Sequence, residues 1–474
     1  MQGRKNYQEQ LFTNFQLSDR VPQDNFYRRL KETLDLTFLY KETAKYYGAE
    51  GQKSIDPVVF FKLMLVGYLE NQPSDRRIIA TSSMRMDILY FIGYNIDEEL
   101  PWHSTLSRTR QLYEESVFVD LFKLVLKQCV EKGMLSGRRQ AVDSVLVKAN
   151  ASMESLIDIH GEVVTFNQQI TANQQDQAED KDQNQDSQGQ DGASQGQESD
   201  QKSSNKTRRS TTDPGSRMAV KPGKALKLNY LAQVSVDTSS HVITHIEAFH
   251  ADKKDNQCLD KVVSSAVNNL AENNLAVEEV LADANYSSSD SLQKLKRRGI
   301  RGYIPNTGSY KAERQGFGYD QQNDLYYCSQ GKPLAFVHYR HHHGYSKVYQ
   351  SRRSDCKNCS LKESCIGRSS QKTITSSVSK PLFEQMHQRI NSSIGRAMMR
   401  IRKSTVEPVI GTLVEYTGMK KVHTKGIKLA NKCMLLAAIS YNLKKLMKYK
   451  APEEILKKLL RQVPDMYFTV SLGW

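Results

Sequence analysis

The sequence has no long, uninterrupted apolar run. Its longest apolar stretch, PVVFFKLMLVGYL at residues 57–69, contains Lys62 and is shorter than the ~20 residues that a bilayer-spanning helix needs. The opening residues, MQGRKNYQEQ, are polar and contain no apolar core of the kind found in a signal peptide. We therefore expect a cytoplasmic protein with no membrane partner.

Cysteine is also scarce, with seven residues in a chain of 474. Three of them, Cys129, Cys258 and Cys433, are scattered, which fits a reducing compartment and argues against a disulfide framework. A chain of this length is too long for one compact core, so two or three domains are expected.

One internal segment lacks almost everything that a core needs. Residues 168–206 contain twelve Gln, eight acidic residues and three Lys, with no aromatic residue and Ile170 as the only large aliphatic residue. Such a composition cannot bury enough surface to fold. The sequence predicts a disordered, acidic, Gln-rich insertion over about 167–212.

Acidic residues are almost missing from another segment, 396–450. The chain as a whole has a net charge of +15, and within this segment thirteen Lys and Arg face only Glu407 and Glu415. Many ordinary proteins are moderately basic, but so uneven a distribution favours a polyanionic partner such as nucleic acid.

The first 135 residues have helical patterns. Residues 24–48 place Phe26, Leu30, Leu34 and Phe38 on one face, and residues 54–70 begin with cap candidates followed by Pro57. Further on, Ser104 or Thr105 could start a helix that presents Arg108 and Arg110. We interpret residues 1–136 as a helical DNA-binding or dimerisation domain. A helical support domain with solvated arginines is an equally good reading.

Beyond residue 137 strands alternate with helices. Strands are predicted at 138–149, 229–237, 241–251, 277–283 and 301–306, with helices at 256–274 and 288–299. This order predicts an α/β domain with a mixed sheet and flanking helices, and it places the Gln-rich segment as an insertion between the first two strands.

Two of these strands carry an unexpected carboxylate. Asp143 lies within QAVDSVLV, and Asp283 ends the apolar run of VEEVLAD. Either residue alone is best read as a turn-forming Asp. Two in one domain, both in hydrophobic strands, favour a shared cation instead, and paired carboxylates suit Mg²⁺.

Four stretches resemble a known family. AVDSVLVKANAS (141–152), LADANYSSSD (281–290) and the segment from Arg402 to Leu446 are similar to the three catalytic blocks of bacterial insertion-sequence DDE transposases. The stretch from Ser54 to Arg110 is similar to the helical domain that precedes the catalytic domain in one group of them. The resemblance implies an RNase H-like catalytic domain over 137–450, with a tail at 451–474.

The resemblance also implies a site and an activity. Asp143, Asp283 and Glu407 match the three catalytic carboxylates, with Glu415 as a rival for the third position. Pro408 predicts a kink or a helix start at Glu407. Such carboxylates hold two Mg²⁺ or Mn²⁺ ions, which drive DNA cleavage and strand transfer at terminal inverted repeats.

The implied partners are double-stranded DNA, both transposon ends and target, and a second copy of the chain in a homodimer. Candidate DNA contacts outside the carboxylates are basic residues: Arg108, Arg110, Arg402, Lys403, Lys420, Lys421 and Lys425. Two alternatives remain: an inactive or domesticated DNA-binding relative, and an RNase H-like structure-specific nuclease.

The remaining cysteines cluster between Asp283 and Glu407. Cys328, Cys356, Cys359 and Cys365 lie in a Cys-rich insertion over 306–380 and could supply four thiolates to a structural, zinc-ribbon-like Zn²⁺ site. Substitute ligands are available in the neighbouring histidines His338, His341, His342 and His343. The alternative is a metal-free loop with reduced cysteines.

Overall fold

The computed structural model describes residues 15–48, 54–158, 205–220, 225–308, 314–341 and 345–450, together with residues 2, 5, 50, 223 and 310. Three predicted features lie partly or wholly outside this part of the chain. They are residues 167–204 of the Gln-rich insertion, His342 and His343, and the tail at 451–474.

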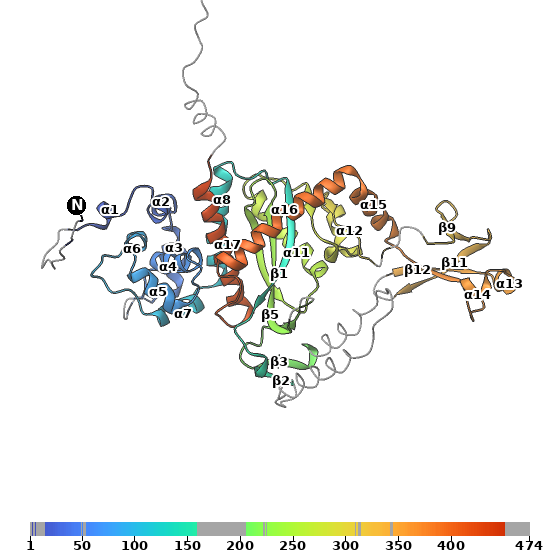
Figure 1. Cartoon of the computed structure of the whole chain (residues 1–474), viewed down its shortest axis with the longest axis horizontal. Helices are drawn as coiled ribbons and strands as arrows, with labels where there is room; N and C mark the ends of the chain where they lie inside the picture. The colour runs from blue at the N-terminus through green and yellow to red at the C-terminus, as the bar shows by residue number, and fades with distance from the viewer. Residues whose placement is uncertain are drawn as a thin grey trace, which may run out of the picture.

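The molecule is elongated (Figure 1). Short N-terminal helices form one end, a sheet flanked by helices forms the middle, and a small separate sheet projects at the other end. No described helix is both long and apolar enough to cross a membrane.

The N-terminal region is helical, as predicted. Its elements are α1 (Leu17–Arg20), α2 (Phe26–Thr33), α3 (Phe38–Thr43), η1 (Ala44–Tyr46), α4 (Pro57–Leu69), α5 (Asp75–Ser83), α6 (Met86–Ile92), α7 (His103–Leu112) and α8 (Glu115–Glu131).

Two local predictions in this region can be compared with the structure. The α4 prediction is confirmed, since Pro57 is the first helical residue and the Asp56 carboxylate accepts hydrogen bonds from the amides of Val58 and Val59. The predicted helix over 24–48 is instead divided into α2 and α3. Between them the Asp35 carboxylate accepts a hydrogen bond from the Thr37 amide, which competes with helical backbone bonding.

The central sheet has six strands. They are β1 (Arg139–Lys148), β4 (Arg217–Ala219), β5 (Lys227–Asp237), β6 (Ile243–His250), β7 (Glu279–Leu281) and β8 (Arg301–Tyr303). The spatial order is β4-β5-β1-β7-β8, with β6 also paired to β5. β1 pairs antiparallel with β5 and parallel with β7, so β1 is the strand at which the sheet changes from antiparallel to parallel. The predicted mixed α/β sheet is confirmed.

Helices cover both faces of this sheet (Figure 1). On one face Val145 of β1 shares a core with α8 and with α17 (Ile427–Lys448), while Ala141 packs against α16 (Ser393–Tyr416). On the opposite face Val142 packs with α11 (Asp255–Ala271) and α12 (Ser289–Arg297). The alternation along β1 follows the two-residue period of a strand and places Asp143 on the α16 face.

Helix α17 joins the N-terminal helices to the sheet, and one continuous hydrophobic core includes all three. Polar contacts reinforce the joint: the ammonium group of Lys432 donates to the carbonyl oxygens of Arg110 and Tyr113 at 3.0 and 2.5 Å, and that of Lys444 donates to Leu69 O. Lys432 is only 4% exposed. The basic segment 396–450 is therefore not a uniformly exposed surface, because some of its cations bind backbone carbonyls inside the protein.

The Gln-rich insertion ends earlier than the predicted residue 212. Asn205 is buried and exchanges hydrogen bonds with the backbone of Met218. Residues Arg208–Ser210 then form β3, which pairs with β2 (Leu156–Asp158). Ordered structure therefore resumes before 212.

The Cys-rich insertion contains the small separate sheet, with the antiparallel order β13-β12-β11-β10-β9. Its elements are β9 (Phe317–Asp320), β10 (Leu325–Cys328), β11 (Pro333–His341), β12 (Tyr345–Ser351), α13 (Arg353–Lys357), α14 (Lys362–Cys365) and β13 (Thr373–Ser377). Tyr326, Leu334, Tyr349 and Ile374 form its core. From this sheet, α15 (Lys380–Asn391) leads directly into α16.

Candidate active site

Asp143 lies in the middle of β1, opposite Val234 of β5. Its side chain is 17% exposed and faces α16, in a row that otherwise holds Ala141 and Val145. The Ser144 amide donates a 2.7 Å hydrogen bond to the carboxylate. A carboxylate thus occupies a position between apolar side chains on a packed face of the sheet.

Asp283 follows β7, the parallel neighbour of β1. Ala141 of β1 is paired with Leu281 of β7. Asp143 and Asp283 each follow their paired residue by two positions, so they lie at the same height along the two parallel strands. The Asp283 carboxylate accepts a 2.9 Å hydrogen bond from the Asn285 amide, which fixes the turn after the strand. The two predicted aspartates therefore lie side by side, as the sequence indicated.

Arg402 of α16 lies over this pair. One terminal guanidinium nitrogen, Nη2, is 2.7 Å from Asp143 Oδ2 and 3.9 Å from Asp283 Oδ2. Its Nε is buried and has no hydrogen-bond partner within the described ranges. Arg402, which the sequence predicts as a DNA contact, thus forms an ion pair with Asp143 and a longer one with Asp283.

The pKa shifts of Asp143 and Asp283 show that Arg402 offsets only part of the cost of burying these two carboxylates. Burial raises the pKa of Asp143 to about 6, against the opposing effect of Arg402, and the nearby Asp283 carboxylate raises it further. Burial likewise raises the pKa of Asp283, and Arg402 again opposes the shift. Both carboxylates would be better stabilised by additional positive charge.

Glu407, the predicted third carboxylate, is exposed on α16 and is not brought to the pair. It lies five residues after Arg402, which on an α-helix is about 140° around the axis. Among the described residues, no three His, Cys, Asp or Glu side chains form a group that could hold a metal ion. The predicted helix start at Glu407 is wrong, since α16 runs from Ser393 to Tyr416 with Pro408 inside it.

The rival Glu415 is further from the pair. At 1.5 Å per residue, Glu407 lies about 7.5 Å along the helix from Arg402 and Glu415 about 20 Å. Glu415 also pairs with Lys420, at 3.7 Å, and its carbonyl oxygen accepts a hydrogen bond from Asn71 of the N-terminal region. Because Glu415 lies further away and is already paired, Glu407 is the better candidate to approach the two aspartates.

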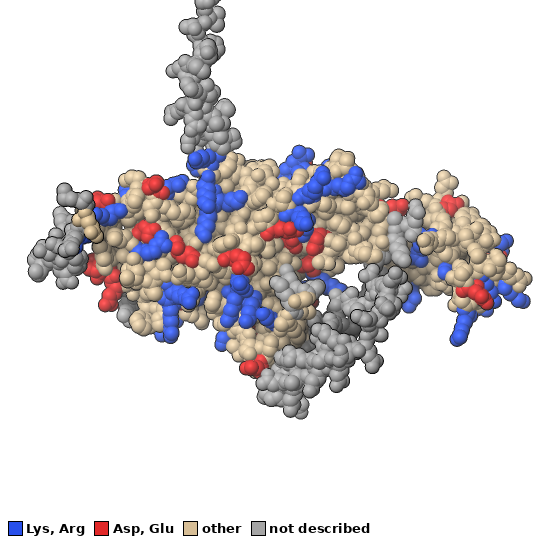
Figure 2. Space-filling view, viewed as in Figure 1, with Lys and Arg blue, Asp and Glu red and all other residues tan. Residues whose placement is uncertain are grey.

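Basic side chains surround this region. Exposed Arg396, Arg400 and Lys403 follow one another at intervals of four and three residues, so they share one face of α16 with Glu407. Figure 2 shows Lys and Arg gathered over α16.

A basic loop follows α16. Lys420 and Lys425 are exposed and Lys421 is half-buried. Backbone hydrogen bonds from Lys148 to Lys420 O, and from Val422 to Lys148 O, hold this loop against the end of β1. These predicted DNA contacts thus lie at the end of the strand that carries Asp143.

The two arginines predicted on the N-terminal helices have different positions. Arg108 is exposed on α7. Arg110 is directed inward, with a side chain only 8% exposed that forms an ion pair with Asp75. The prediction of Arg110 as a DNA contact is therefore wrong, because an internal carboxylate already binds its guanidinium.

The four clustered cysteines meet around one small cavity of about 40 Å³. Cys328 comes from β10, Cys356 from α13, Cys359 from the following loop and Cys365 from α14. All four are free thiols, and the hydroxyl of Ser351 lies 3.1 Å from the Cys356 sulfur. The histidines proposed as substitutes that fall in the described part, His338 and His341, lie on β11 and do not line the cavity.

Two parts of the chain match protein-family models. Residues 15–112 match a transposase domain of the DUF772 family, and residues 327–447 match a transposase DDE domain. The second match includes Arg402 and Glu407, whereas Asp143 and Asp283 lie between the two matched segments. No curated protein matches the chain.

One solved structure overlaps with much of the chain. It is described as a cryo-EM structure of the piggyBac transposase synaptic complex with hairpin DNA. The match covers 94% of this chain and 81% of the piggyBac chain, at 9% sequence identity. The TM-score is 0.30, which is too low to establish a common fold.

Proposed function

Because the chain belongs to the DDE transposases, we propose that it cleaves DNA at the terminal inverted repeats of an insertion sequence and transfers the strands to a target, in a reaction that requires Mg²⁺. The observation that carries this proposal is the convergence of Asp143 and Asp283, from adjacent parallel strands, on a single cationic group. The other contacts and charges described above support it.

The sheet order supports an RNase H-like catalytic domain. Reading β6-β5-β1-β7-β8, the first three strands are antiparallel to their neighbours, whereas β7 and β8 run parallel to β1 and follow α11 and α12. In such a sheet the ends of neighbouring strands form a natural site for charged ligands. We assign the catalytic role to Asp143, in the middle of β1, and to Asp283, two residues after the end of β7.

The residues of this site suit a hard divalent cation. Asp143 and Asp283 offer carboxylate oxygens, the ligand type that Mg²⁺ and Mn²⁺ prefer. Burial raises the pKa of both carboxyl groups, and Arg402 opposes that rise only in part. We propose these two aspartates as ligands and Glu407 as the third. When bound, two such ions would activate the attacking oxygen and stabilise the leaving oxygen of a phosphodiester.

The protein's own residues have separate tasks in this proposal. Asp143 is held rigidly by β1 and by the Ser144 amide, and Asp283 by the Asn285 amide. Glu407 needs a change in α16 or in its own rotamer to join them. Arg402 offsets part of the charge of the aspartates until the ions enter, and its departure then places a cation on the face where DNA would lie.

We propose that DNA lies across α16 and the basic loop. Arg396, Arg400, Lys403, Lys420 and Lys425 are exposed there and would contact phosphates, with Lys421 beside them. Arg108 is a further exposed candidate. Cleavage at two ends of one element implies two active sites, so we propose a homodimer in the active complex.

We also propose a structural Zn²⁺ in the Cys-rich insertion. Four thiols around one cavity provide the donor set of a closed tetrahedral site. Of the described groups none is already at metal-binding spacing, so the cysteine side chains would have to draw closer as the ion binds. The site would cross-link β10 to the α13–α14 segment and stabilise the insertion.

Incubation with DNA that carries the inverted repeats flanking its gene, plus a target plasmid, tests the function. Joined donor–target products identify a transposase. Cleavage without joining would identify a structure-specific nuclease, and binding without cleavage in Mg²⁺ would identify an inactive relative. Either of these two results would overturn the proposal.

A further inference from the structure

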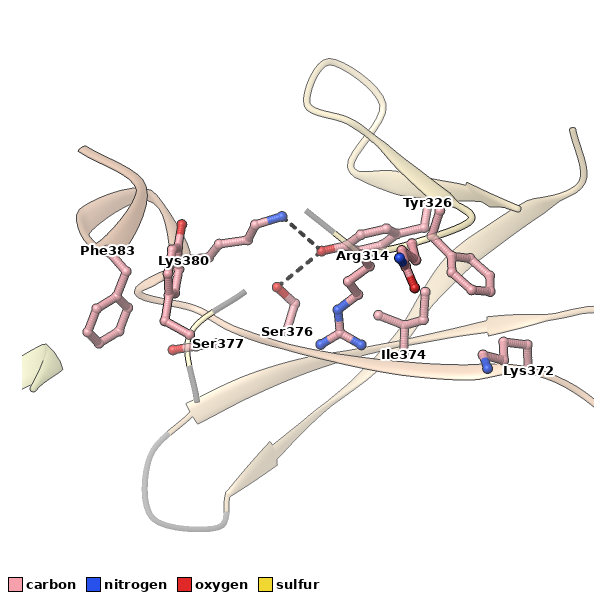
Figure 3. A pocket seen from close by; sticks show the side chains of 11 residues that line it. Arg314, Tyr326, Lys372, Ile374, Ser376, Ser377, Lys380 and Phe383 are labelled. Carbon is pink, nitrogen blue, oxygen red and sulfur yellow. Dashed lines mark hydrogen bonds between the residues drawn. The ribbon is translucent and has the colours of Figure 1, made fainter. Parts of the chain in front are cut away.

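A second cavity lies where the small sheet of the Cys-rich insertion meets the beginning of α15 (Figure 3). Its volume is about 530 Å³, within the range of pockets that hold small ligands. Side chains from β9, β10, β13 and α15 line it, and neither Asp143 nor Asp283 is among them. It is therefore separate from the carboxylate site.

The lining of this cavity is basic. Arg314, Lys372 and Lys380 line it, and no Asp or Glu does. Within the described ranges none of these three cations forms an ion pair with a carboxylate; Arg314 donates to the carbonyl oxygen of Thr375 and Lys372 to that of Cys365. An adjoining cavity of about 630 Å³ shares Arg314 and Lys380 and includes one acid, Glu384. Three cations whose charge no carboxylate neutralises attract an anion to this cavity.

The polar groups of the cavity are arranged in a chain (Figure 3). The Lys380 ammonium donates to the Tyr326 hydroxyl at 3.2 Å, and that hydroxyl donates to the Ser376 hydroxyl at 3.3 Å. Tyr310 also lines the cavity, and its hydroxyl is buried and has no hydrogen-bond partner in the described part of the chain. A buried hydroxyl without a partner is costly, so a ligand that bonds to it would be stabilising.

Aromatic rings form the rest of the wall. Phe317, Tyr326 and Phe383 line the cavity, and the Tyr310 and Phe383 rings are 6.0 Å apart. Cations lie close to these rings, with Lys372 Nζ 5.2 Å from the Phe317 centroid. Flat apolar surfaces beside unpaired cations match one ligand class well, a nucleotide, whose base stacks and whose phosphate is anionic.

We propose that this cavity holds one unpaired nucleotide of a DNA strand. The inference rests on the proposed function, since it takes DNA as the substrate. Arg314 and Lys380 contact the phosphate, while Phe383 and Tyr310 contact the base. The cavity also opens at the N-terminus of α15, whose partial positive charge favours an anion, and α15 leads into the helix that carries Arg402.

The test uses a ten-residue thymidine oligonucleotide with one central 2-aminopurine, in EDTA so that no cleavage occurs. Its fluorescence falls when the base stacks, and its anisotropy reports binding. The double variant Arg314→Gln/Lys380→Gln should bind about tenfold more weakly and lose the fluorescence decrease. Phe383→Leu should lose most of the decrease with a smaller change in affinity.

The matched control is Arg353→Gln/Lys357→Gln. It removes the same charge from exposed positions of the same insertion that do not line the cavity, and it should bind like wild type. Equal loss in both double variants, or no loss in either, would overturn the proposal. Full competition by inorganic phosphate alone would also overturn it, since the site would then recognise a free anion.

This result is independent of the carboxylate chemistry. If the cavity variants bind the oligonucleotide like wild type while Asp143→Asn abolishes DNA cleavage, the nucleotide site is wrong and the proposed function stands. If the wild-type protein does not cleave DNA but the cavity variants still lose oligonucleotide binding, the proposed function is wrong and the nucleotide site stands.

Discussion

The Nη2 atom of Arg402 lies 2.7 Å from Oδ2 of Asp143, although the two residues are 259 positions apart in the chain. This contact closes α16 over the centre of the sheet and supplies positive charge to a pair of half-buried carboxylates. It also provides part of the charge compensation that two acidic side chains on a packed sheet face require.

The first prediction concerns stability and pH. The folded-state pKa of Asp143, about 6, is above its usual 3.8, so the folded protein holds this proton more tightly than the unfolded chain does. The stability from this proton is fully present below about pH 4 and is lost as pH rises through 6. At pH 7.5 in EDTA, Asp143→Asn should therefore raise the free energy of unfolding by roughly 2–3 kcal/mol.

Thermal unfolding at pH 7.5 and pH 4.0 checks this prediction. The midpoint of Asp143→Asn should exceed that of wild type at pH 7.5, and the difference should shrink at pH 4.0. Asp290→Asn, which changes an exposed carboxylate on α12, should show no such dependence. A less stable Asp143→Asn protein at pH 7.5 would mean that the ion pair with Arg402 outweighs the burial cost.

The second prediction concerns Arg402. Arg402→Gln removes the cation that compensates Asp143 and Asp283, so the metal-free protein should be destabilised and added Mn²⁺ should restore more stability than in wild type. Measuring the unfolding temperature with and without Mn²⁺ gives both effects. Lys403→Gln, at the exposed neighbouring position, should respond to Mn²⁺ as wild type does. An equal response in both variants would show that Arg402 does not occupy the place of a metal ion.

The third prediction concerns zinc. Purified protein should contain about one Zn²⁺ per chain, and Cys356→Ser or Cys359→Ser should lower that content and the unfolding temperature of the insertion. Cys258→Ala changes a cysteine of the sheet core and should keep its zinc. Elemental analysis that finds no zinc in fresh wild-type protein would contradict the site.

The fourth prediction concerns the basic loop. Replacing Lys420, Lys421 and Lys425 by Gln should weaken binding to all DNA sequences alike. The slope of log affinity against log salt should become shallower by about 0.9 for each phosphate that the protein no longer binds. Lys41, Lys127 and Lys132 are exposed on or beside α3 and α8, and their replacement removes equal charge. If that control changes the slope as much, the loop does not bind DNA specifically.

The sequence predicts the strands and helices of the central domain well because their signals are local. The apolar runs around Asp143 and before Asp283 mark β1 and β7, and the parallel pairing of these strands then places the two carboxylates side by side. The interior partners of Arg402 and Arg110 could not be predicted in this way. Asp143 and Asp75 lie far from them in the sequence, and an arginine that binds a carboxylate has no different local pattern from one that is exposed to solvent.

The same limit applies to charge. Thirteen cations in 396–450 predicted a basic surface, but Lys432 is buried against backbone carbonyls of the N-terminal region. Only tertiary packing decides which lysines remain exposed. Glu407 is a further example, since the resemblance assigns it as the third carboxylate but the local sequence does not determine which way α16 faces.

Cleavage of end DNA in Mg²⁺, measured beside binding of the same DNA, tests the central claim most directly. Asp143→Asn, Asp283→Asn and Glu407→Gln preserve shape and remove charge, so each should abolish cleavage and strand transfer while binding survives. Glu415→Gln is the matched control on the same helix and should cleave normally. Near-normal cleavage by Glu407→Gln with an inactive Glu415→Gln would contradict the third ligand, and near-normal cleavage by Asp143→Asn or Asp283→Asn would contradict the carboxylate mechanism itself.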